Sequence, residues 1–346
     1  MLIKKEGIST MSGSRQDYRK KKKKKNWKKY ILLPLLILML GALSYSGYLY
    51  YKANDVVKDS YVELDRDKDK DKDNSAVENV SILIAGVDTG GNRGETLGIR
   101  TDALMVATFN KDTKSVKLLS IPRDTYTYIP RKGYNDKINH AYGAGGIESS
   151  IETVEKLLDI PIDYYVQLNF NAFIEIVDAL DGIYVDVPIT FTEQDSNDKA
   201  GAIHLEKGYQ LLDGEQALAL ARTRKIDNDI ERGKRQQLIV AAIANRALSS
   251  ASIFKYADVL DAVGNNLTTN LSFSEMTSFI KYFSNSNGLD IDSLTLDGFD
   301  SYKKGIYYYE LDEDQLYTIQ QTLKAHLGLI DAPSLDTTDE DDTTNN

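Results

Sequence analysis

The sequence contains no cysteine, only six prolines, one tryptophan and three histidines among its 346 residues. Without cysteine, disulfides, thiolate metal sites and a cysteine nucleophile are excluded. His140, His204 and His326 are widely separated, so no pair has the spacing expected of metal ligands. The GxSxG, P-loop and GxGxxG signatures are also absent from the sequence. A nucleophile elbow and the common nucleotide-binding loops are therefore not expected.

Charge is divided between two regions of opposite sign. Residues 1–29 contain ten lysines and two arginines against two acidic residues, a net charge of +10, whereas the whole chain carries −10. The remaining 317 residues therefore carry −20. An acidic body of this kind repels nucleic acid unless a local basic patch overrides the repulsion, so no nucleic-acid partner is expected.

A long uncharged stretch, from Tyr30 to Tyr51, follows this basic tail. As a helix its 22 residues would span about 33 Å, which matches a bilayer core of about 30 Å. The stretch is longer than a signal-peptide core and ends without a small-residue cleavage site, which favours a retained transmembrane helix. The lysines on its N-terminal side predict a cytoplasmic N-terminus. We therefore expect a single-pass protein of the cell membrane, with everything from about Lys52 onward outside the cell.

Two low-complexity segments frame one folded region. Residues 65–73 alternate acidic and basic side chains, and residues 331–346 are acidic and polar. Neither segment can bury apolar surface, so we expect a solvated linker and a disordered tail. The expected organisation is a cytoplasmic tail (1–29), a transmembrane helix (30–51), a charged extracellular linker (52–78), a folded domain (79–329) and an acidic tail (330–346).

Within the folded domain, β-rich runs alternate with stretches of helical periodicity. The predicted strands are 80–87, 103–109, 116–121, 164–168 and 183–187. The predicted helices are 147–158, 172–180, 214–221 and 230–248. Asp213 followed by Gln216 is typical of a capping box at the start of the third helix. This alternation favours an α/β fold with a central sheet, in which ligands gather on loops at strand ends.

Two aspartates lie at the ends of predicted strands. Asp88 follows the first strand and Asp102 precedes the second. If these strands are neighbours, both carboxylates reach one edge of the sheet. Oxygen ligands of this kind suit a hard cation such as Mg²⁺, held jointly with a substrate phosphate. The alternative is that each aspartate simply forms a turn.

Cationic side chains also follow strand and loop ends. Arg100 precedes Asp102, Arg123 follows the third strand, and Lys137 follows a turn. Each residue alone is accounted for by a surface salt bridge, such as Arg123 with Asp124. Together, three cations at such positions in an α/β fold favour an anion site.

The richest basic run lies between residues 220 and 237. Arg222 and Arg224 are at the end of one predicted helix, while Arg232 and Gln236 are one turn apart near the start of the next. A cation near a helix N-terminus is locally unfavourable, which suggests that an anion is expected there. The alternative is a solvated face whose charge is offset by neighbouring acidic residues. Lys225 and Lys234 are expected to face solvent, and Asp227 and Asp229 to orient the arginines.

Several motifs occur in the same order as in one known family. They are GVD at 86–88, RTD at 100–102, SIPRD at 120–124, KINHAYG at 137–143, LxGxxAL and ARxR at 212–224, and RxxRQQ at 232–237. With the basic tail and the single anchor, this pattern resembles the LytR-CpsA-Psr (LCP) family of Gram-positive bacteria. The resemblance is strong over about residues 79–248 and loose beyond them. It implies an α/β/α layered domain with a central mixed β-sheet, preceded by one transmembrane helix.

Members of this family are membrane-anchored phosphotransferases. They take an anionic glycopolymer, of the teichoic acid or capsular type, from a polyprenyl-pyrophosphate carrier and attach it to N-acetylmuramic acid of peptidoglycan. The resemblance therefore implies an Mg²⁺-dependent glycopolymer–peptidoglycan phosphotransferase, with a possible pyrophosphatase side activity. Its implied partners are the lipid-linked polymer, peptidoglycan and the membrane.

The matched positions imply roles for individual residues. Asp88 and Asp102 match the pair that holds Mg²⁺ near the pyrophosphate. The positions associated with the pyrophosphate are matched by Arg100, Arg123, Lys137, Arg222, Arg224, Arg232 and Gln236. Asp102, Arg100 and Arg123 are expected to act in catalysis, and the general base is either Asp88 or Asp102.

Two other functions stay open on the sequence alone. A transcriptional regulator would need a cytoplasmic DNA-binding segment, but the 29 residues before the predicted anchor are too few for a helix-turn-helix domain. A non-catalytic binder of polyprenyl pyrophosphate would use the same site residues. Lipid binding also needs an apolar tunnel. Its expected lining residues, which would equally suit core packing, are Ile174, Ile176, Leu180, Leu238 and Ile243.

Overall fold

The computed structural model describes residues 47–48, 51, 54–55, 58, 60–64, 79–87, 100–223, 228–248, 259, 266–272, 274–276, 278–279 and 290–331. The chain divides into two compact units, Met1–Tyr48 and Leu49–Asn346, and every strand and helix named below lies in the second. Most of the predicted membrane helix, linker and acidic tail lie outside the described residues. Among the residues that are described, no helix is long and apolar enough to cross a membrane.

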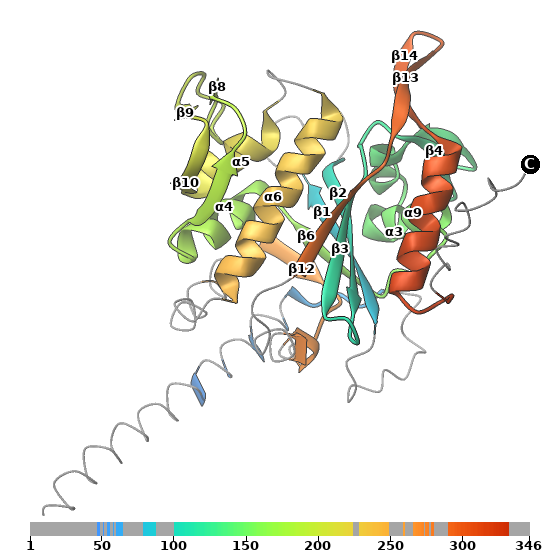
Figure 1. The fold of residues 1–346 in the computed structure, drawn as a ribbon, viewed down its shortest axis with the longest axis horizontal. Coiled ribbons are helices and arrows are strands. Elements are labelled where there is room, and N and C mark those ends of the chain that lie inside the picture. The colour runs from blue at the N-terminus through green and yellow to red at the C-terminus, as the bar shows by residue number, and fades with distance from the viewer. Residues whose placement is uncertain are drawn as a thin grey trace, which may run out of the picture. The chain divides into compact units, whose positions relative to one another are not determined.

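A six-stranded sheet forms the centre of the domain (Figure 1). Its strands, in order across the sheet, are β11 (Leu267–Thr269), β6 (Tyr164–Leu168), β1 (Val80–Val87), β2 (Thr101–Asn110), β3 (Ser115–Ser120) and β12 (Asp290–Thr295). β1 is parallel to β6 and antiparallel to β2, and β3 is parallel to β12. The predicted mixed central sheet is confirmed. The two strands expected to carry Asp88 and Asp102 at their ends are neighbours.

Helices cover both faces of this sheet (Figure 1). α3 (Gly146–Leu158) and α9 (Glu313–His326) cover one face, and α4 (Phe170–Ala179), α5 (Gly214–Arg222) and α6 (Asp229–Ala247) cover the other. The described part of the chain therefore has the three layers that the resemblance implies.

Two-stranded ribbons and short 3₁₀ helices complete the described elements. The ribbons pair β4 (Tyr126–Ile129) with β5 (Tyr134–Lys137), β7 (Ile183–Val187) with β10 (Gly208–Leu212), β8 (Phe191–Glu193) with β9 (Ile203–Leu205), and β13 (Gly298–Lys303) with β14 (Ile306–Leu311). The 3₁₀ helices are η2 (Ile138–His140) and η3 (Tyr142–Ala144). The predicted strand 183–187 is confirmed, but it pairs with β10 in a ribbon of its own and not in the central sheet.

Polar caps mark the starts of α4, α5 and α6. The side chain of Asn169 accepts a hydrogen bond from the backbone N–H of Ala172 at 2.9 Å, so α4 begins two residues before its predicted start. The predicted capping box of Asp213 and Gln216 is confirmed at the start of α5. α6 begins after Asn228, whose side chain caps its first turn.

Alternation along the strands divides the core in two. Leu83 and Ala85 of β1 are fully buried and belong to the apolar layer packed against α3 and α9. Ile82 and Ile84, their neighbours in sequence, point to the opposite face, where they line a cavity. One face of the sheet is therefore packed against helices, and the other lines a cavity.

Candidate active site

A cavity of about 640 Å³ lies between the central sheet and helices α4, α5 and α6. Its apolar lining comes from Ile82, Ile84, Gly86, Ala103, Met105, Ala107, Phe109, Val166, Leu168, Phe170, Phe173, Ile176, Leu218, Ala221, Ile239, Val240, Ile243 and Ala244. Its polar lining comes from Asp102, Asn169, Glu193, Gln194, Arg222, Arg232 and Gln236. The volume is within the usual range of ligand pockets, about 300–1,000 Å³.

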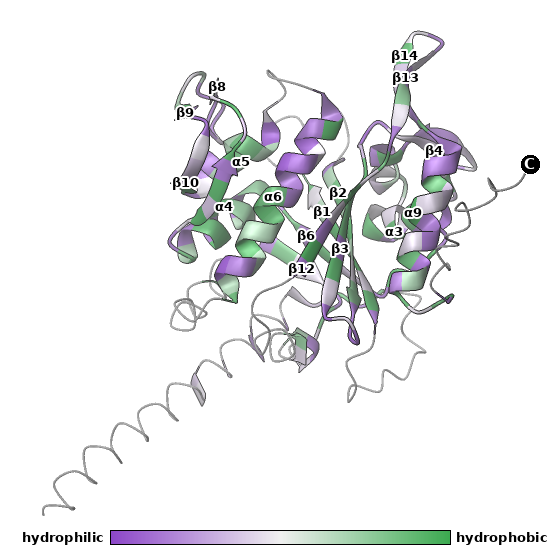
Figure 2. Cartoon of the chain, in the orientation of Figure 1, coloured by the Kyte–Doolittle hydropathy of each residue, from purple (hydrophilic) through white to green (hydrophobic). Residues whose placement is uncertain are grey.

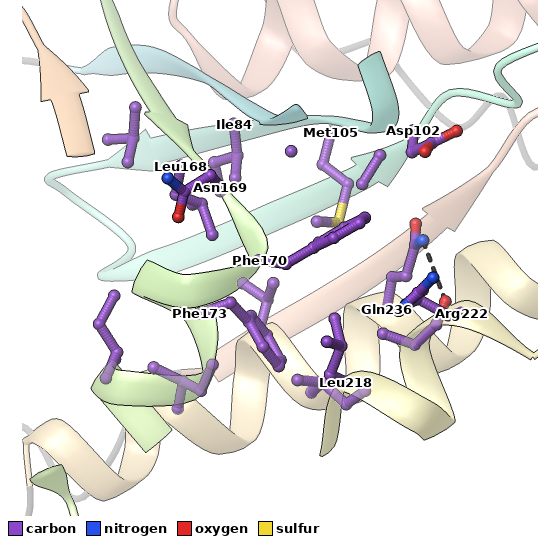
Figure 3. Close-up of a pocket in the computed structure, with 18 of the residues that line it drawn as sticks. Ile84, Asp102, Met105, Leu168, Asn169, Phe170, Phe173, Leu218, Arg222 and Gln236 are labelled. Atoms are coloured by element: carbon purple, nitrogen blue, oxygen red, sulfur yellow. Dashed lines mark hydrogen bonds between the residues drawn. The ribbon is translucent and has the colours of Figure 1, made fainter. Parts of the chain in front are cut away.

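Charged side chains gather at one end of the cavity (Figure 3). Asp102, Arg222 and Gln236 lie together at this end, whereas Ile84 and Leu168 lie toward the other, where Asn169 is a polar neighbour of Leu168. The cavity therefore offers an apolar channel that ends in charged and amide groups.

Helix α6 contributes to both parts of the cavity. Its lining residues recur three or four positions apart and form one stripe: Arg232, Gln236, Ile239, Val240, Ile243 and Ala244. The first two are polar and the last four are apolar, and Figure 2 shows the same change from hydrophilic to hydrophobic along the helix. One helix thus presents a cation at its first turn and hydrocarbon over the following turns.

Arg123 is at the centre of a charged cluster beside the polar end. Its Nη1 donates to Oδ1 of Asp102 at 3.0 Å, and its Nε lies 3.4 Å from Oδ2 of Asp124. The same Nε lies 3.6 Å from Oδ2 of Asp229, whose Oδ1 lies 2.9 Å from Nη1 of Arg232. The expected pair of Arg123 with Asp124 is therefore present, but as one part of a cluster that joins the sheet edge to α6. Asp229 contacts Arg232 of the basic run, as predicted, and also Arg123, which the sequence did not predict.

The position of Arg232 favours a bound anion. Its side chain is almost completely buried, with the residue 4% exposed, in the first turn of α6. A buried cation is costly unless opposite charge surrounds it, and the helix dipole disfavours a cation at this end. Because Arg232 also lines the cavity, an anion bound there would lower the energy of the guanidinium.

Lys137 supports this cluster from outside the cavity lining. Its Nζ donates to Oδ1 of Asp124 at 2.7 Å. Burial raises the pKa of Asp124, but the hydrogen bond from Lys137 and the charges of Arg123 and Lys137 outweigh it and hold the pKa below its ordinary value. Asp124 therefore stays ionised and bridges the two cations. The sequence predicts that Lys137 contacts the pyrophosphate, whereas the structure places its ammonium against Asp124.

Arg222 and Gln236 are held at the polar end by contacts from α4 and α5. The guanidinium carbon of Arg222 lies 4.8 Å from the ring centre of Phe170, and its Nη2 lies 3.9 Å from Oδ1 of Asp198. The side-chain amide of Gln236 donates to the carbonyl of Ala221 at 3.2 Å, as Figure 3 shows. These contacts leave both side chains in the cavity lining.

The placement of α6 depends on residues that sequence reasoning did not assign. Arg235 is buried, and its guanidinium donates to the carbonyls of Leu220 and Thr223, at 3.2 and 2.7 Å. Gln237 donates to the carbonyls of Leu118 and Leu294, each at 2.7 Å, which ties α6 to β3 and to the residues of β12. Arg235 and Gln237 belong to the RxxRQQ motif, as do the cavity residues Arg232 and Gln236. Only the structure shows which of the four line the cavity and which hold the helix in place.

Some of the other predicted residues are described by the structure and some are not. Asp88 and Arg224 lie outside the described residues, as do Lys225 and Asp227. Val87, which precedes Asp88 in sequence, pairs with Thr101 at the start of β2. Arg100 is exposed next to that strand. Lys234 is half exposed and pairs with Glu231 at 2.7 Å, so its predicted solvent-facing position is confirmed.

The predicted tunnel lining is right in part. Ile176 and Ile243 line the cavity, but Ile174, Leu180 and Leu238 are not among the lining residues. Leu238 is 47% exposed because it lies on the outer face of α6, and Leu180 is 1% exposed within the packed core at the end of α4. The missed lining residues come mainly from the strands, whose alternation into two core faces could have revealed Ile82 and Ile84.

At the polar end, Asp102 offers the carboxylate oxygens that a divalent cation prefers as ligands. Among the described residues, no group of three acidic or histidine side chains is arranged to hold a metal. Asp102 supplies carboxylate oxygens at the cavity, and Asp88 lies outside the described part of the chain. A Mg²⁺ ion at this place would need further oxygens from a phosphate ligand, which is the usual way that Mg²⁺ is held beside a substrate.

Comparison with known proteins places this architecture in a family. The LytR_cpsA_psr family model matches residues 47–325. A Bacillus subtilis (strain 168) protein, the polyisoprenyl-teichoic acid–peptidoglycan teichoic acid transferase TagT, is 37% identical over 320 residues, which cover 91% of this chain and 98% of TagT.

Solved structures agree with this match in fold. TagT bound to LI-WTA superposes with a TM-score of 0.63 at 34% identity, covering 78% of this chain and 100% of that one. TagT with bound octaprenyl pyrophosphate lipid gives a TM-score of 0.59 at 32% identity, with the same coverage. The family match and the identity to TagT together show that this chain belongs to the LytR_cpsA_psr family.

Proposed function

We propose that this protein transfers an anionic glycopolymer from a polyprenyl-pyrophosphate carrier to N-acetylmuramic acid of peptidoglycan. The observation that carries the proposal is the mainly apolar cavity, at one end of which Asp102, Arg222 and Gln236 gather, with Arg232 also in its lining. A lipid-linked polymer has the same two parts in the same order, a hydrocarbon chain and then a pyrophosphate. The name of TagT and the octaprenyl pyrophosphate bound in one of its structures support this assignment.

The arginines bind and orient the pyrophosphate. A pyrophosphate diester carries two negative charges, and a guanidinium can bind phosphate oxygens through two parallel hydrogen bonds. Arg222 and Arg232 line the cavity, and Arg123 stands next to it through its contact with Asp102. Because their carboxylate partners fix these side chains before substrate arrives, little reorganisation is needed as charge develops in the transition state.

The reaction exchanges the phosphoanhydride bond of the pyrophosphate for a phosphate ester bond to the muramic oxygen. The muramic hydroxyl oxygen attacks the phosphorus that carries the polymer, and the bond from this phosphorus to the bridging oxygen breaks. Polyprenyl phosphate leaves, with its negative charge stabilised by the arginines. The hydroxyl proton passes to a carboxylate, for which Asp102 and Asp88 are the candidates.

Magnesium is part of this proposal. Asp102, together with Asp88, would hold the ion, and the bound ion would neutralise charge on the phosphoryl oxygens. The cluster of Arg123, Asp124 and Asp229 lies beside Asp102, and Arg123 holds one of its carboxylate oxygens.

The proposed location is the outer side of the cell membrane. The basic tail and the uncharged stretch 30–51 support a single-pass anchor with a cytoplasmic N-terminus. Such an anchor would keep the apolar cavity close to its lipid substrate.

Reconstituted transfer tests the function directly. The full-length protein in detergent is mixed with lipid-linked polymer, Mg²⁺ and peptidoglycan sacculi stripped of polymer. The expected result is polymer bound covalently to the sacculi, with an equal amount of polyprenyl phosphate released. Tight binding of the lipid without any release would instead identify a non-catalytic binder.

Protease treatment of whole cells tests the location. An external protease should digest the folded domain in intact cells. Protection of the domain until the cells are lysed would contradict the proposed topology and favour a cytoplasmic role such as transcriptional regulation.

A further inference from the structure

The β13–β14 hairpin projects from the edge of the sheet that carries the charged cluster (Figure 1). β12 ends beside the end of β3, with Thr295 paired to Ser120, and the hairpin begins three residues later. Lys304 and Gly305 form its two-residue turn, with φ of 53° and 79°. This left-handed pair is the geometry that closes a tight hairpin, so the projection is a defined element.

The two faces of this hairpin carry different side chains. Tyr302 lies opposite Tyr307, and their ring centres are 5.6 Å apart at 65°. Tyr302 is 72% exposed, and the hydroxyl of Tyr307 donates to Oδ1 of Asp300 at 2.9 Å. Phe299, three residues before Tyr302, lies on the opposite face by strand alternation and is 57% exposed.

The face with Tyr302 and Tyr307 is connected to the charged cluster. The backbone N–H of Tyr309 donates to the carbonyl of Asp124 at 2.9 Å, which fixes the base of the hairpin to the cluster. Nζ of Lys137 lies 5.6 Å from the ring centre of Tyr307. Burial, the hydrogen bond to Asp300 and the negative charges of Asp300, Asp124 and Asp229 raise the pKa of Tyr307 above its ordinary value. Tyr307 therefore faces the cluster and stays a neutral hydrogen-bond donor.

We propose that the hairpin face formed by Asp300, Tyr302 and Tyr307 binds the sugar rings of the acceptor glycan strand. The proposal rests on the proposed function, because the donor lipid occupies the cavity and the acceptor must approach from outside its polar end. The hairpin stands at that edge. Sugars present an apolar C–H face to an aromatic ring and hydroxyls to polar groups at its rim, which the two tyrosines and Asp300 provide together.

The charge of the hairpin suits a glycan better than a strongly charged partner. Its acidic and basic side chains balance, as Asp300 and Glu310 offset Lys303 and Lys304. Lys303 is paired with Glu310 at 2.8 Å. A surface that combines exposed rings with nearly neutral charge is typical of recognition through stacking and hydrogen bonds.

Binding of full-length protein to polymer-free sacculi tests this inference. The variants are Tyr302→Ala, Phe299→Ala on the opposite hairpin face, and Tyr209→Ala as a matched control. Tyr209 is 73% exposed and pairs with Tyr184 at 5.5 Å on a separate ribbon, so its removal is a similar change elsewhere. Binding of polyprenyl pyrophosphate and the extent of transfer are measured on the same samples.

The expected result is that Tyr302→Ala weakens sacculus binding by roughly five-fold or more, as for loss of an aromatic anchor. Transfer by Tyr302→Ala should fall in parallel, while its lipid binding stays unchanged. Phe299→Ala and Tyr209→Ala should bind sacculi and transfer polymer like the parent protein. Unchanged sacculus binding by Tyr302→Ala would overturn the inference, as would an effect confined to self-association or protein capture. If no sample transfers polymer yet sacculus binding still depends on Tyr302, the proposed function fails while glycan binding by the hairpin stands.

Discussion

The two faces of the central sheet are built from the same strands, yet one is filled, whereas the other is packed in part and encloses the cavity. We call them the filled face and the hollow face. On the α3–α9 face, Leu83, Ala85 and Val106 are fully buried in a continuous apolar core. On the opposite face, Ile84 and Met105 line the cavity. Apolar character is similar on both faces, so it does not decide which face is packed. The position of the covering helices decides it.

Helix α6 explains why the second face stays open. Gln237 ties the helix to β3 and β12, and a side chain added at Gly233 would lie 2.6 Å from the hydroxyl of Ser120. The helix therefore approaches the sheet closely where it crosses β3 and its neighbour β12. The neighbouring strands β1, β2 and β6 supply the sheet side of the cavity.

The largest expected difference between the faces is in stability. Leu83→Ala removes a fully buried side chain from the filled face and should lower the free energy of unfolding by about 3–4 kcal/mol. Ile84→Ala enlarges a space that already exists, and about half that loss is expected. Urea unfolding of the two variants makes the comparison. Equal losses would show that the cavity face is packed as tightly as the other.

The filled face also contains a histidine that should make stability depend on pH. His326 of α9 is 8% exposed, and its ring nitrogens contact the hydroxyls of Thr108 and Ser115 at 2.8 and 2.9 Å. Burial, and then the charge of Lys117, lower the pKa of His326 to about 4 from an ordinary 6.5.

Between these two values only the unfolded chain binds the proton, so stability should fall as the pH drops from about 6.5 to about 4. The full loss is about 3 kcal/mol, and the contribution is complete above pH 6.5. Urea unfolding at pH 7.5 and pH 4.5 measures it, with His326→Gln as the variant. The prediction is wrong if His326→Gln shows the same pH dependence as the parent over this range.

Substitutions at the polar end of the cavity should lower the transfer activity. Arg123→Ala removes the side chain that joins Asp102, Asp124 and Asp229, and transfer should fall about 100-fold or more, close to 2.7 kcal/mol. Lys234→Ala, an exposed cation on α6 paired with Glu231, is the control and should transfer normally. Activity of Arg123→Ala within a few-fold of the parent would remove Arg123 from the proposed machinery.

A matched pair of alanines gives the smallest but most direct contrast. Ala107→Leu extends into the cavity, so lipid binding should weaken about ten-fold, near 1.4 kcal/mol, with little loss of stability. Ala85→Leu inserts the same atoms into the filled face, and overpacking should cost about 1–3 kcal/mol of stability. The measurements are lipid binding and urea unfolding of both variants. If Ala107→Leu lost as much stability as Ala85→Leu, the cavity would have no free space next to Ala107 in the native protein, and the prediction would be wrong.

Local signals predicted five of the fourteen described strands and four of the five described α-helices. The strand predicted at 80–87 and the helices predicted to start at residues 147 and 214 agree with the structure to within one residue. Strand alternation and the capping box of Asp213 are signals that act over a few residues. The β13–β14 hairpin and α9 were not predicted, and they lie beyond the last family motif, which ends at residue 237. The β4–β5 ribbon was also not predicted, since its two strands have only four residues each. β7 was predicted as a strand, but its partner was not, since strand pairing depends on contacts distant in sequence.

The sequence predicted which types of residue form the site, but only part of their arrangement in space. Arg222, Arg232 and Gln236 line the cavity as expected from their motif. Lys137 of the KINHAYG motif and Arg235 of the RxxRQQ motif carry the same charge as these arginines, yet Lys137 donates to Asp124 and Arg235 donates to backbone carbonyls. Charge and spacing cannot separate a ligand-binding cation from an anchoring one, because the difference is which partner lies within hydrogen-bond reach.

By itself, the sequence determined which residues carry charge, which segments alternate as strands, and which motifs mark the family. These properties are local, since they depend on side-chain chemistry and on spacings of two or about 3.6 residues. Only the tertiary structure decided that one apolar face of the sheet is filled and the other hollow. It also decided that Arg123 binds Asp102, Asp124 and Asp229 together. Both outcomes depend on where α6 meets the sheet, which is set by contacts between residues more than fifty positions apart.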